Sequence, residues 1–303
     1  MILYKYRQDG PYTEKLITDQ KVWLSNAAGL NDPFECKITE IAKDWIEKQV
    51  EIGMQGHITG LVMEAERAKR EGRFLFGLSP REIKGVIKKI GKAKGLNGQY
   101  KRFREFIKSR TGSYPSDPRS PFKNFDKQLE NVGIFSLSEN PTNQLMWAHY
   151  AAESKGLAFG FEVAQGSKLA DKEHCIPVSY SDELPAFEGD GFIAEMEMCI
   201  TASGPVTTQK IGFSDPTFKK AVSTKPSCWS YEEEWRYIEE GCGLYPYPGP
   251  LVEIVFGLRC PDDVMEKYIE LSRDHIGEGI TYKKIENPKN SNRMEVVDLQ
   301  MSF

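Results

Sequence analysis

A switch in the spacing of apolar residues divides this chain into two kinds of sequence. From about residue 37 to 130, residues such as Ile38, Ile41 and Trp45 recur at helical spacing. On either side, apolar residues form short runs bounded by turn residues, which is typical of strands. The pattern predicts an α+β fold with a mixed or antiparallel sheet, flanking helices and a mostly helical insertion after the first strands. The expected domains are 1–36 plus 132–303 for the sheet and 37–131 for the insertion.

The individual elements follow from the same patterns. Ser79-Pro80-Arg81-Glu82 is a strong helix start, because Ser suits the N-cap, Pro the first position and Glu the third. In the insertion we expect helices at 37–54, 57–71, 80–94 and 99–110. Further helices are expected at 142–152, 214–223 and 261–274. Strands are expected at 2–7, 22–25, 133–138, 156–163, 175–180, 234–238, 252–256 and 280–285.

Charge follows the same division. Residues 37–131 hold 21 Lys/Arg and 12 Asp/Glu, whereas the rest of the chain holds 19 and 32, giving the net charge of −4. Ten of these cations and only one acid, Glu105, lie between Lys84 and Arg110. Two helices coated in this way would attract nucleic-acid phosphates or an acidic protein. A solvated helix face is the alternative interpretation.

Several classes of protein are excluded by what the sequence lacks. It has no signal-peptide pattern and no apolar run of membrane-spanning length, so we expect a cytoplasmic protein. The six cysteines form no C-x2-C pair and the four histidines no metal-ligand spacing, so we expect reduced cysteines and no metal site. A loose G-x-G-x-x-A at 189–194 lacks the strand–turn–helix frame of a dinucleotide fingerprint.

The densest polar cluster is the acidic run at 232–234. On a strand, Glu232 and Glu234 would point to one face and Glu233 to the other. Two neighbouring carboxylates raise the pKa of at least one of them, which suits acid–base chemistry. The alternative is a solvated turn, in which Glu233 faces water and Arg236 pairs with a neighbour.

Three further segments offer polar side chains near the ends of predicted elements. Ser136 and Ser138 share one strand face, His149 lies in an aromatic helix, and Arg7 ends the first strand. The Arg7 guanidinium could hold a phosphate or carboxylate through two hydrogen bonds. The structural alternatives are a helix cap from Ser138 or Asn140, a satisfied packing role for His149, and a surface position for Arg7.

Together these segments resemble a bacterial and phage family known as domain of unknown function 2971. The resemblance rests on landmarks that cover nearly the whole chain outside 37–131 but imply no activity by themselves. They are Leu3-Tyr4-Lys5-Tyr6-Arg7, Trp23-Leu24-Ser25, Leu30-Asn31-Asp32-Pro33-Phe34-Glu35, Ser136-Leu137-Ser138, Met146-Trp147-x-His149-Tyr150-Ala151, Lys155-Gly156 and Trp229-x-Tyr231-Glu232-x-Glu234-Trp235-Arg236.

The chain also resembles mono-ADP-ribosyltransferases of the arginine–serine–glutamate type. These enzymes carry an Arg on the first strand, a Ser-x-Ser strand and a Glu-x-Glu at the start of a later strand. Arg7, Ser136-Leu137-Ser138 and Glu232-Glu233-Glu234 occur in that order. Two departures are Leu137 in place of the usual Thr and the gap of about 130 residues between Arg7 and Ser136, which the insertion accounts for.

This resemblance implies an NAD-using transferase, acting as an effector in phage defence or a toxin system. Glu234 would stabilise the oxocarbenium-like state of the ribose, and Glu232 would orient or deprotonate the acceptor. Arg7 would hold the pyrophosphate or ribose, and Ser138 or Ser136 would fix Glu234. The implied catalytic set is Glu234, Glu232, Arg7, Ser138 and His149, and the implied NAD-binding set is Arg7, Tyr4, Tyr6, Ser136 and Asn31, with Trp23 as a further aromatic surface.

Two other functions remain open from the sequence. In the first, the protein binds or cleaves nucleic acid, and a metal-dependent reaction would require Asp32, Glu35, Glu232 and Glu234 to converge. In the second, it is a non-catalytic interaction protein, which predicts no deep pocket joining Arg7, Ser138, His149 and Glu234.

Overall fold

The computed structural model describes residues 1–187, 193–201 and 204–299, and it divides the chain into two compact units. Unit 1 consists of Met1–Ile38, Lys127–Pro185 and Thr217–Phe303. Unit 2 consists of Thr39–Asp126 and Ala186–Pro216. Both units are thus assembled from segments that are separated in the sequence.

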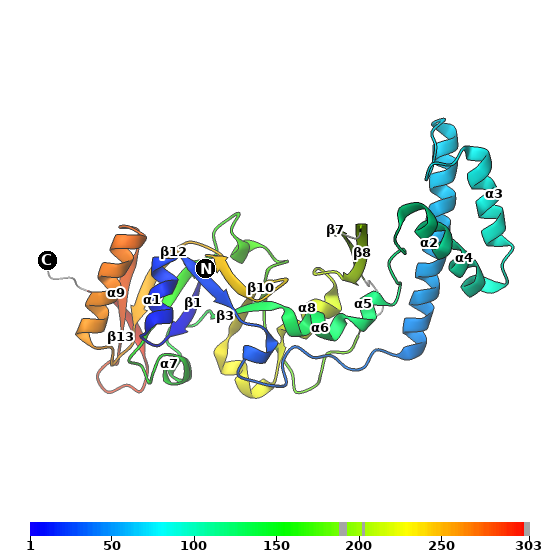
Figure 1. Cartoon of the computed structure of the whole chain (residues 1–303). Coiled ribbons are helices and arrows are strands. Elements are labelled where there is room, and N and C mark those ends of the chain that lie inside the picture. The colour runs from blue at the N-terminus through cyan, green and yellow to red at the C-terminus, as the bar shows by residue number, and fades with distance from the viewer. Residues whose placement is uncertain (188–192, 202–203, 300–303) are drawn as a thin grey trace. The chain divides into compact units, whose positions relative to one another are not determined.

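Unit 1 is built on an eight-stranded sheet with the order β14-β13-β12-β4-β1-β3-β10-β5 (Figure 1). In this sheet β12 and β13 are parallel, and the other described neighbours are antiparallel. This mixed sheet confirms the predicted α+β fold class. The strands are β1 (Ile2–Arg7), β3 (Gly133–Ser138), β4 (Leu157–Glu162), β5 (Cys175–Pro177), β10 (Glu234–Glu239), β12 (Leu251–Phe256), β13 (Thr281–Glu286) and β14 (Glu295–Asp298).

Helices cover both faces of this sheet. On one face α1 (Pro11–Thr18) and α9 (Asp262–His275) pack together over a core that includes Leu3 and Phe159. On the other face α7 (Gln144–Tyr150) buries Trp147 against Tyr4 and Tyr6. Alternate residues of β1 therefore enter different cores, as the two-residue period of a strand requires.

Short elements complete unit 1. Two small sheets pair β2 (Lys21–Leu24) with β11 (Gly243–Pro246), and β6 (Ser179–Tyr180) with β9 (Thr224–Lys225). The 3-10 turns are η1 (Ala27–Gly29), η2 (Lys168–Ala170) and η3 (Ser227–Glu232). Helices α6 (Phe125–Asn131) and α8 (Pro216–Ser223) begin where the chain passes between the units.

The sheet opens between β1 and β3. Strand β1 pairs with β4 along its whole length, but its recorded register with β3 is the single pair Tyr4–Ser138. Beyond that pair, the Lys5 Nζ donates to the Ser136 carbonyl oxygen at 2.8 Å, so a side chain replaces a strand-to-strand hydrogen bond. This opening positions the site described below.

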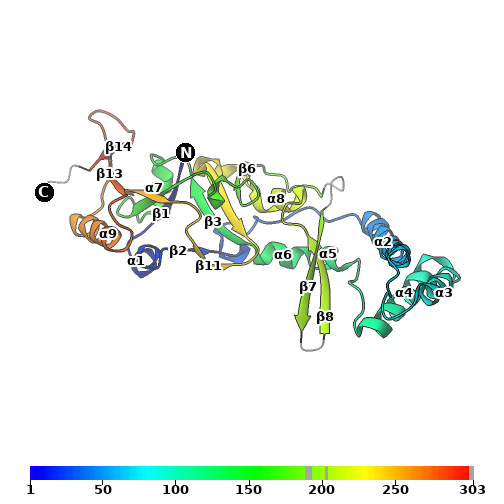
Figure 2. The same cartoon turned by 90° about the horizontal axis from the view of Figure 1, so that it is seen from above.

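Unit 2 is mainly helical. It contains α2 (Lys43–Arg70), α3 (Pro80–Gly91), α4 (Gly95–Thr111), α5 (Ser120–Lys123) and the hairpin of β7 (Ala194–Thr201) and β8 (Gly204–Ile211), which Figure 2 shows from above. The first three helices share a core that includes Met54, Ile83 and Phe103. Ser79 and Glu82 form the expected capping box at the start of α3.

The prediction of separate helices at 37–54 and 57–71 is wrong, because α2 is one helix of 28 residues. Glycine weakens a helix interior by about 1 kcal/mol, but buried residues on both sides of Gly53 and Gly56 outweigh this cost. A Cβ at Gly53 would lie 2.9 Å from the Pro118 Cβ, so this glycine serves close packing.

Three further observations concern membrane-spanning helices, the cysteines and the glycine motif. No helix among the described residues is long and apolar enough to cross a membrane. The cysteines whose side chains are described, Cys36, Cys175, Cys228, Cys242 and Cys260, are free thiols. The G-x-G-x-x-A at 189–194 lies mostly outside the described residues, and so does the side chain of Cys199.

Candidate functional site

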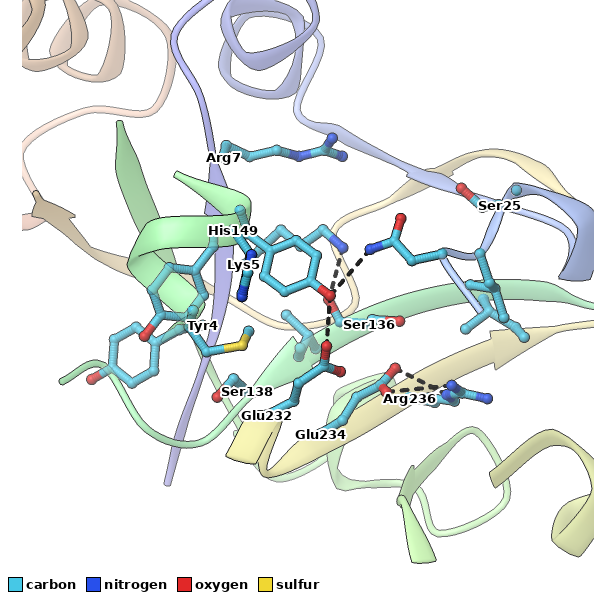
Figure 3. A pocket seen from close by; sticks show the side chains of 18 of the residues that line it. Tyr4, Lys5, Arg7, Ser25, Ser136, Ser138, His149, Glu232, Glu234 and Arg236 are labelled. Atoms are coloured by element: carbon cyan, nitrogen blue, oxygen red, sulfur yellow. Dashed lines mark hydrogen bonds and ion pairs between the residues drawn. The ribbon is translucent and has the colours of Figure 1, made fainter. Parts of the chain in front are cut away.

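A cavity of about 370 Å³ lies in unit 1 where β1 and β3 separate (Figure 3). Its wall comes from the first strands, from β3, from α7 and from the segment around β9 and β10. Every residue proposed above for catalysis or NAD binding lines this cavity: Tyr4, Tyr6, Arg7, Asn31, Ser136, Ser138, His149, Glu232 and Glu234. The hypothesis of a non-catalytic interaction protein predicts no such shared pocket.

Three adjacent strands supply the arginine, serine and glutamate. Arg7 ends β1, Ser138 ends β3 and Glu234 begins β10. Ser138 pairs with Tyr4 of β1 on one side and with Glu234 of β10 on the other. Tyr4, Ser138 and Glu234 therefore form one row across the sheet. Residues more than 90 positions apart in the sequence thereby meet at one point.

A buried ion cluster forms one side of the cavity. The Lys225 Nζ lies 2.5 Å from Glu232, 3.1 Å from Glu234 and 3.5 Å from Glu35. The fully buried Arg236 donates from Nε to Glu234 at 2.9 Å and from Nη2 to Glu35. We call Glu35, Glu232, Glu234, Lys225 and Arg236 the ion cluster. Three carboxylates and two cations give it a formal charge of −1 when all are ionised.

Burial sets the proton affinities within the ion cluster. Burial raises the pKa of Glu234, and the opposing effect of Lys225 is smaller. For Lys225 the balance is reversed: burial alone would lower its pKa, but Glu234 and Glu232 together raise it above the ordinary lysine value. Lys225 therefore stays charged at neutral pH and holds the carboxylates together.

Local backbone geometry turns both carboxylates inward. Glu232 ends η3, Glu233 adopts a left-handed φ of 46°, and Glu234 begins β10. This turn leaves Glu233 exposed while Glu232 and Glu234 are buried. The solvated-turn interpretation thus applies to Glu233, but not to its two neighbours.

A short hydrogen-bond chain leads to Glu232. The Asn31 Nδ2 donates to the Tyr150 hydroxyl at 3.1 Å, and this hydroxyl donates to Glu232 Oε1 at 2.6 Å. Burial, followed by the Glu232 carboxylate, raises the pKa of Tyr150, so the phenol keeps its proton. His149 is exposed at the cavity wall, with its ring 6.3 Å from those of Tyr150 and Tyr231.

Lys5 and Arg7 bring positive charge without a carboxylate partner. Within the described part of the chain neither forms an ion pair, and the buried Nε of Arg7 has no hydrogen-bond partner. Burial, followed by repulsion from Arg7, lowers the pKa of Lys5 to about 7. Arg7 also has its pKa lowered by burial, but a guanidinium remains charged at neutral pH. Figure 3 shows Arg7 apart from Glu232 and Glu234.

The structure corrects several local expectations. Asn143 caps α7 by accepting from the Leu145 and Met146 amides, so neither Ser138 nor Asn140 is the helix cap. The Ser138 hydroxyl instead accepts from the Asn140 amide at 3.3 Å. Glu35, Glu232 and Glu234 do converge, but around Lys225 and Arg236. Within the described residues, no group of three His, Cys, Asp or Glu side chains is arranged so that it could hold a metal ion.

Sequence reasoning missed Lys5 and Lys225. Lys5 lies between Tyr4 and Tyr6 of the first strand. The available signal was its spacing of two residues from Arg7, which places both side chains on the same face of a strand. Lys225 lies in β9, a strand of two residues that no periodicity reveals. Asp32, which was grouped with the other acids, accepts from the Trp229 Nε1 at 2.8 Å beside the ion cluster.

The comparisons with known proteins support one of the two resemblances. The model of a family described as "Protein of unknown function (DUF2971)" matches residues 146–237. The match extends from α7 through β10 and includes His149, Tyr150 and four of the five ion-cluster residues. No curated protein and no solved structure matches the chain significantly. The chain is therefore similar to a family whose description states no activity.

Proposed function

We propose that unit 1 is an ADP-ribosyltransferase-like domain that uses NAD. The main support is that Arg7, Ser138 and Glu234, from three adjacent strands, line one cavity. The biological setting of a phage-defence or toxin effector, which the resemblance implies, belongs to the same proposal.

The charge distribution of the cavity suits a dinucleotide that carries both positive and negative charge. Arg7 and Lys5 offer a pyrophosphate two cationic groups without an ion-pair partner among the described residues, and the buried Arg7 Nε lacks a hydrogen-bond acceptor that such an anion would supply. The ion cluster carries a formal charge of −1 near Ser138. That charge would favour the cationic nicotinamide ribose and the positive charge that develops as its bond breaks.

The remaining wall residues have roles that follow from their contacts. Trp23 lines the cavity with 53% of its surface exposed, so its ring is open to stacking, whereas Tyr4 and Tyr6 are buried. Glu234 is fixed by Arg236 and Lys225, and it would act as a preorganised negative charge. Glu232, held by Tyr150, would orient the acceptor that attacks the ribose.

The direct test is release of nicotinamide from NAD by the full chain, followed chromatographically together with transfer of labelled ADP-ribose. We expect Arg7→Gln and Glu232→Gln each to lower the rate by about 100-fold or more, the cost of losing one preorganised electrostatic contact. Arg259→Gln is the matched control, because Arg259 is an exposed residue outside the cavity.

Glu234→Gln and Glu232→Gln are informative only with a stability measurement, because both carboxylates belong to the buried ion cluster. Removing one charge from a buried ion cluster can cost about 3–5 kcal/mol of folding free energy, so urea unfolding must accompany the assay. A folded Glu234→Gln protein with full turnover would contradict the role of Glu234. A wild-type chain that neither binds NAD nor releases nicotinamide would overturn the whole proposal.

A further inference from the structure

Unit 2 presents a cluster of exposed cations on two neighbouring helices. We define the basic surface as the exposed Lys and Arg residues between Lys84 and Arg110, which lie on α3, on α4 and in the connection between them. They are Lys84, Lys88, Lys89, Lys92, Lys94, Lys101, Arg102, Lys108 and Arg110. The apolar residues of the same helices, including Ile83, Ile90 and Phe103, are buried in the core of unit 2. The cations are therefore directed outward by the packing of the helices.

Contacts between the helices join the cations into one surface. The Arg102 Nη1 donates to the Lys89 carbonyl oxygen at 2.6 Å, which connects α4 to the second half of α3. At the start of α3, Glu82 lies close enough to Arg110 for an electrostatic interaction. Since α3 and α4 pack side by side (Figures 1 and 2), the cations of the basic surface lie on two neighbouring helices.

Few carboxylates lie near the basic surface, and the interaction of Arg110 with Glu82 is not a direct ion pair. None of its members forms an ion pair among the described residues, whereas Arg67 and Arg73 pair with acids on or next to α2. The one acid in this stretch, Glu105, accepts from the Tyr114 hydroxyl at 3.2 Å. Arg104 and Lys108 lie over the Tyr114 ring, 4.7 and 4.2 Å from its centroid. Binding of an anionic polymer would reduce the repulsion among these closely spaced cations.

We propose that the basic surface binds the phosphate backbone of a nucleic-acid duplex without reading its sequence. From Lys101 to Arg110 the helix rises about 14 Å, a length that spans about four phosphates of one strand. Tyr114 is covered by two cations, so this surface offers phosphate contacts rather than an open ring for base stacking. An acidic protein would have to supply a comparably dense array of carboxylates, and it is the competing outcome of the test.

The test measures binding of the full chain to two fluorescent 20-base-pair duplexes of unrelated sequence over a range of salt concentrations. The variant combines Lys84→Gln, Lys88→Gln, Lys92→Gln and Lys101→Gln, four exposed lysines whose side chains form no hydrogen bond or ion pair with the described residues. The control combines Lys15→Gln, Lys21→Gln, Lys172→Gln and Lys289→Gln, which removes the same charge from exposed sites of unit 1.

We expect both duplexes to bind wild type equally, with an affinity that falls steeply as salt rises. The unit 2 variant should bind at least tenfold more weakly, with a salt slope smaller by about three to four, since each phosphate contact contributes about 0.9. Equal weakening in the control would show a net-charge effect and overturn the proposal. Polyglutamate that displaces the duplex at equal charge concentration would favour an acidic protein instead, and absence of binding at low salt would exclude a nucleic acid.

Discussion

At the scale of single residues, Lys5 is the most unusual group in the cavity. Its amine bridges the opening between β1 and β3, where it donates to a carbonyl oxygen and faces no directly paired carboxylate. Burial and the neighbouring Arg7 lower the pKa of Lys5 to about 7, while Glu234, Glu232 and Lys225 have smaller effects. A neutral amine can still donate to Ser136, so the hydrogen bond survives deprotonation.

This position predicts a pH-dependent affinity for anions. An anion bound beside Lys5 raises the pKa of its amine, so binding takes up a proton above pH 7. The affinity for pyrophosphate or ADP-ribose should therefore be highest below pH 7. It should then fall by up to about tenfold per pH unit as pH rises from 7 toward the pKa of the complex.

Titration calorimetry between pH 6 and pH 9 measures this dependence. Lys5→Arg keeps its charge throughout this range and should flatten the profile, while Lys21→Gln, on an exposed site, should leave it unchanged. A wild-type affinity that is constant across pH 7 would show that Lys5 does not interact with the anion.

At the scale of elements, the end of β1 is held by a close backbone approach. Gly156 precedes β4 beside the end of β1, and a Cβ at this position would overlap the Arg7 carbonyl oxygen. The Gly156 amide also donates to the Ala151 carbonyl oxygen at 2.8 Å, which joins the turn after α7 to the sheet. A glycine at this point therefore controls where β1 places Arg7.

Gly156→Ala should consequently displace the end of β1. We expect the free energy of unfolding to fall by about 1–3 kcal/mol, the usual cost of overpacking, as measured by urea denaturation. Gly279→Ala is the control, because a Cβ there meets no atom within 4 Å and its effect should stay within about 0.5 kcal/mol. Equal stability of the two variants would contradict the close approach.

Local sequence signals predicted some elements well and others poorly. β1 and β3 have the predicted bounds, because their apolar runs end at clear turn residues. The same signals were not recognised in α1, in β7 and in β8, although β7 alternates polar and apolar residues. Propensity also divided α2 at its glycines, although burial on both sides of Gly53 decides for one helix.

At the scale of the whole molecule, the two units have separate hydrophobic cores. Unit 1 buries residues such as Phe159 around its sheet, and unit 2 buries Phe103 among its helices. A domain with its own core unfolds as its own cooperative unit. We therefore expect two transitions in a calorimetric unfolding experiment on the full chain.

Core variants assign these transitions. Truncating a buried phenylalanine costs about 3–5 kcal/mol, so Phe159→Ala should lower the melting temperature of one transition and Phe103→Ala that of the other. A single transition that both variants lower equally would mean that the chain unfolds as one cooperative unit.

The sequence by itself determined the fold class, most strands and the residue types of the candidate site. These depend on periodicity and on local turn chemistry, which are properties of neighbouring residues. Only the tertiary structure decided that Arg7, Ser138 and Glu234 share a cavity, and that Lys225 and Arg236 neutralise most of its acids. Such contacts join positions far apart in the chain. Strand order and burial fix them, and with them the pKa values of the buried groups.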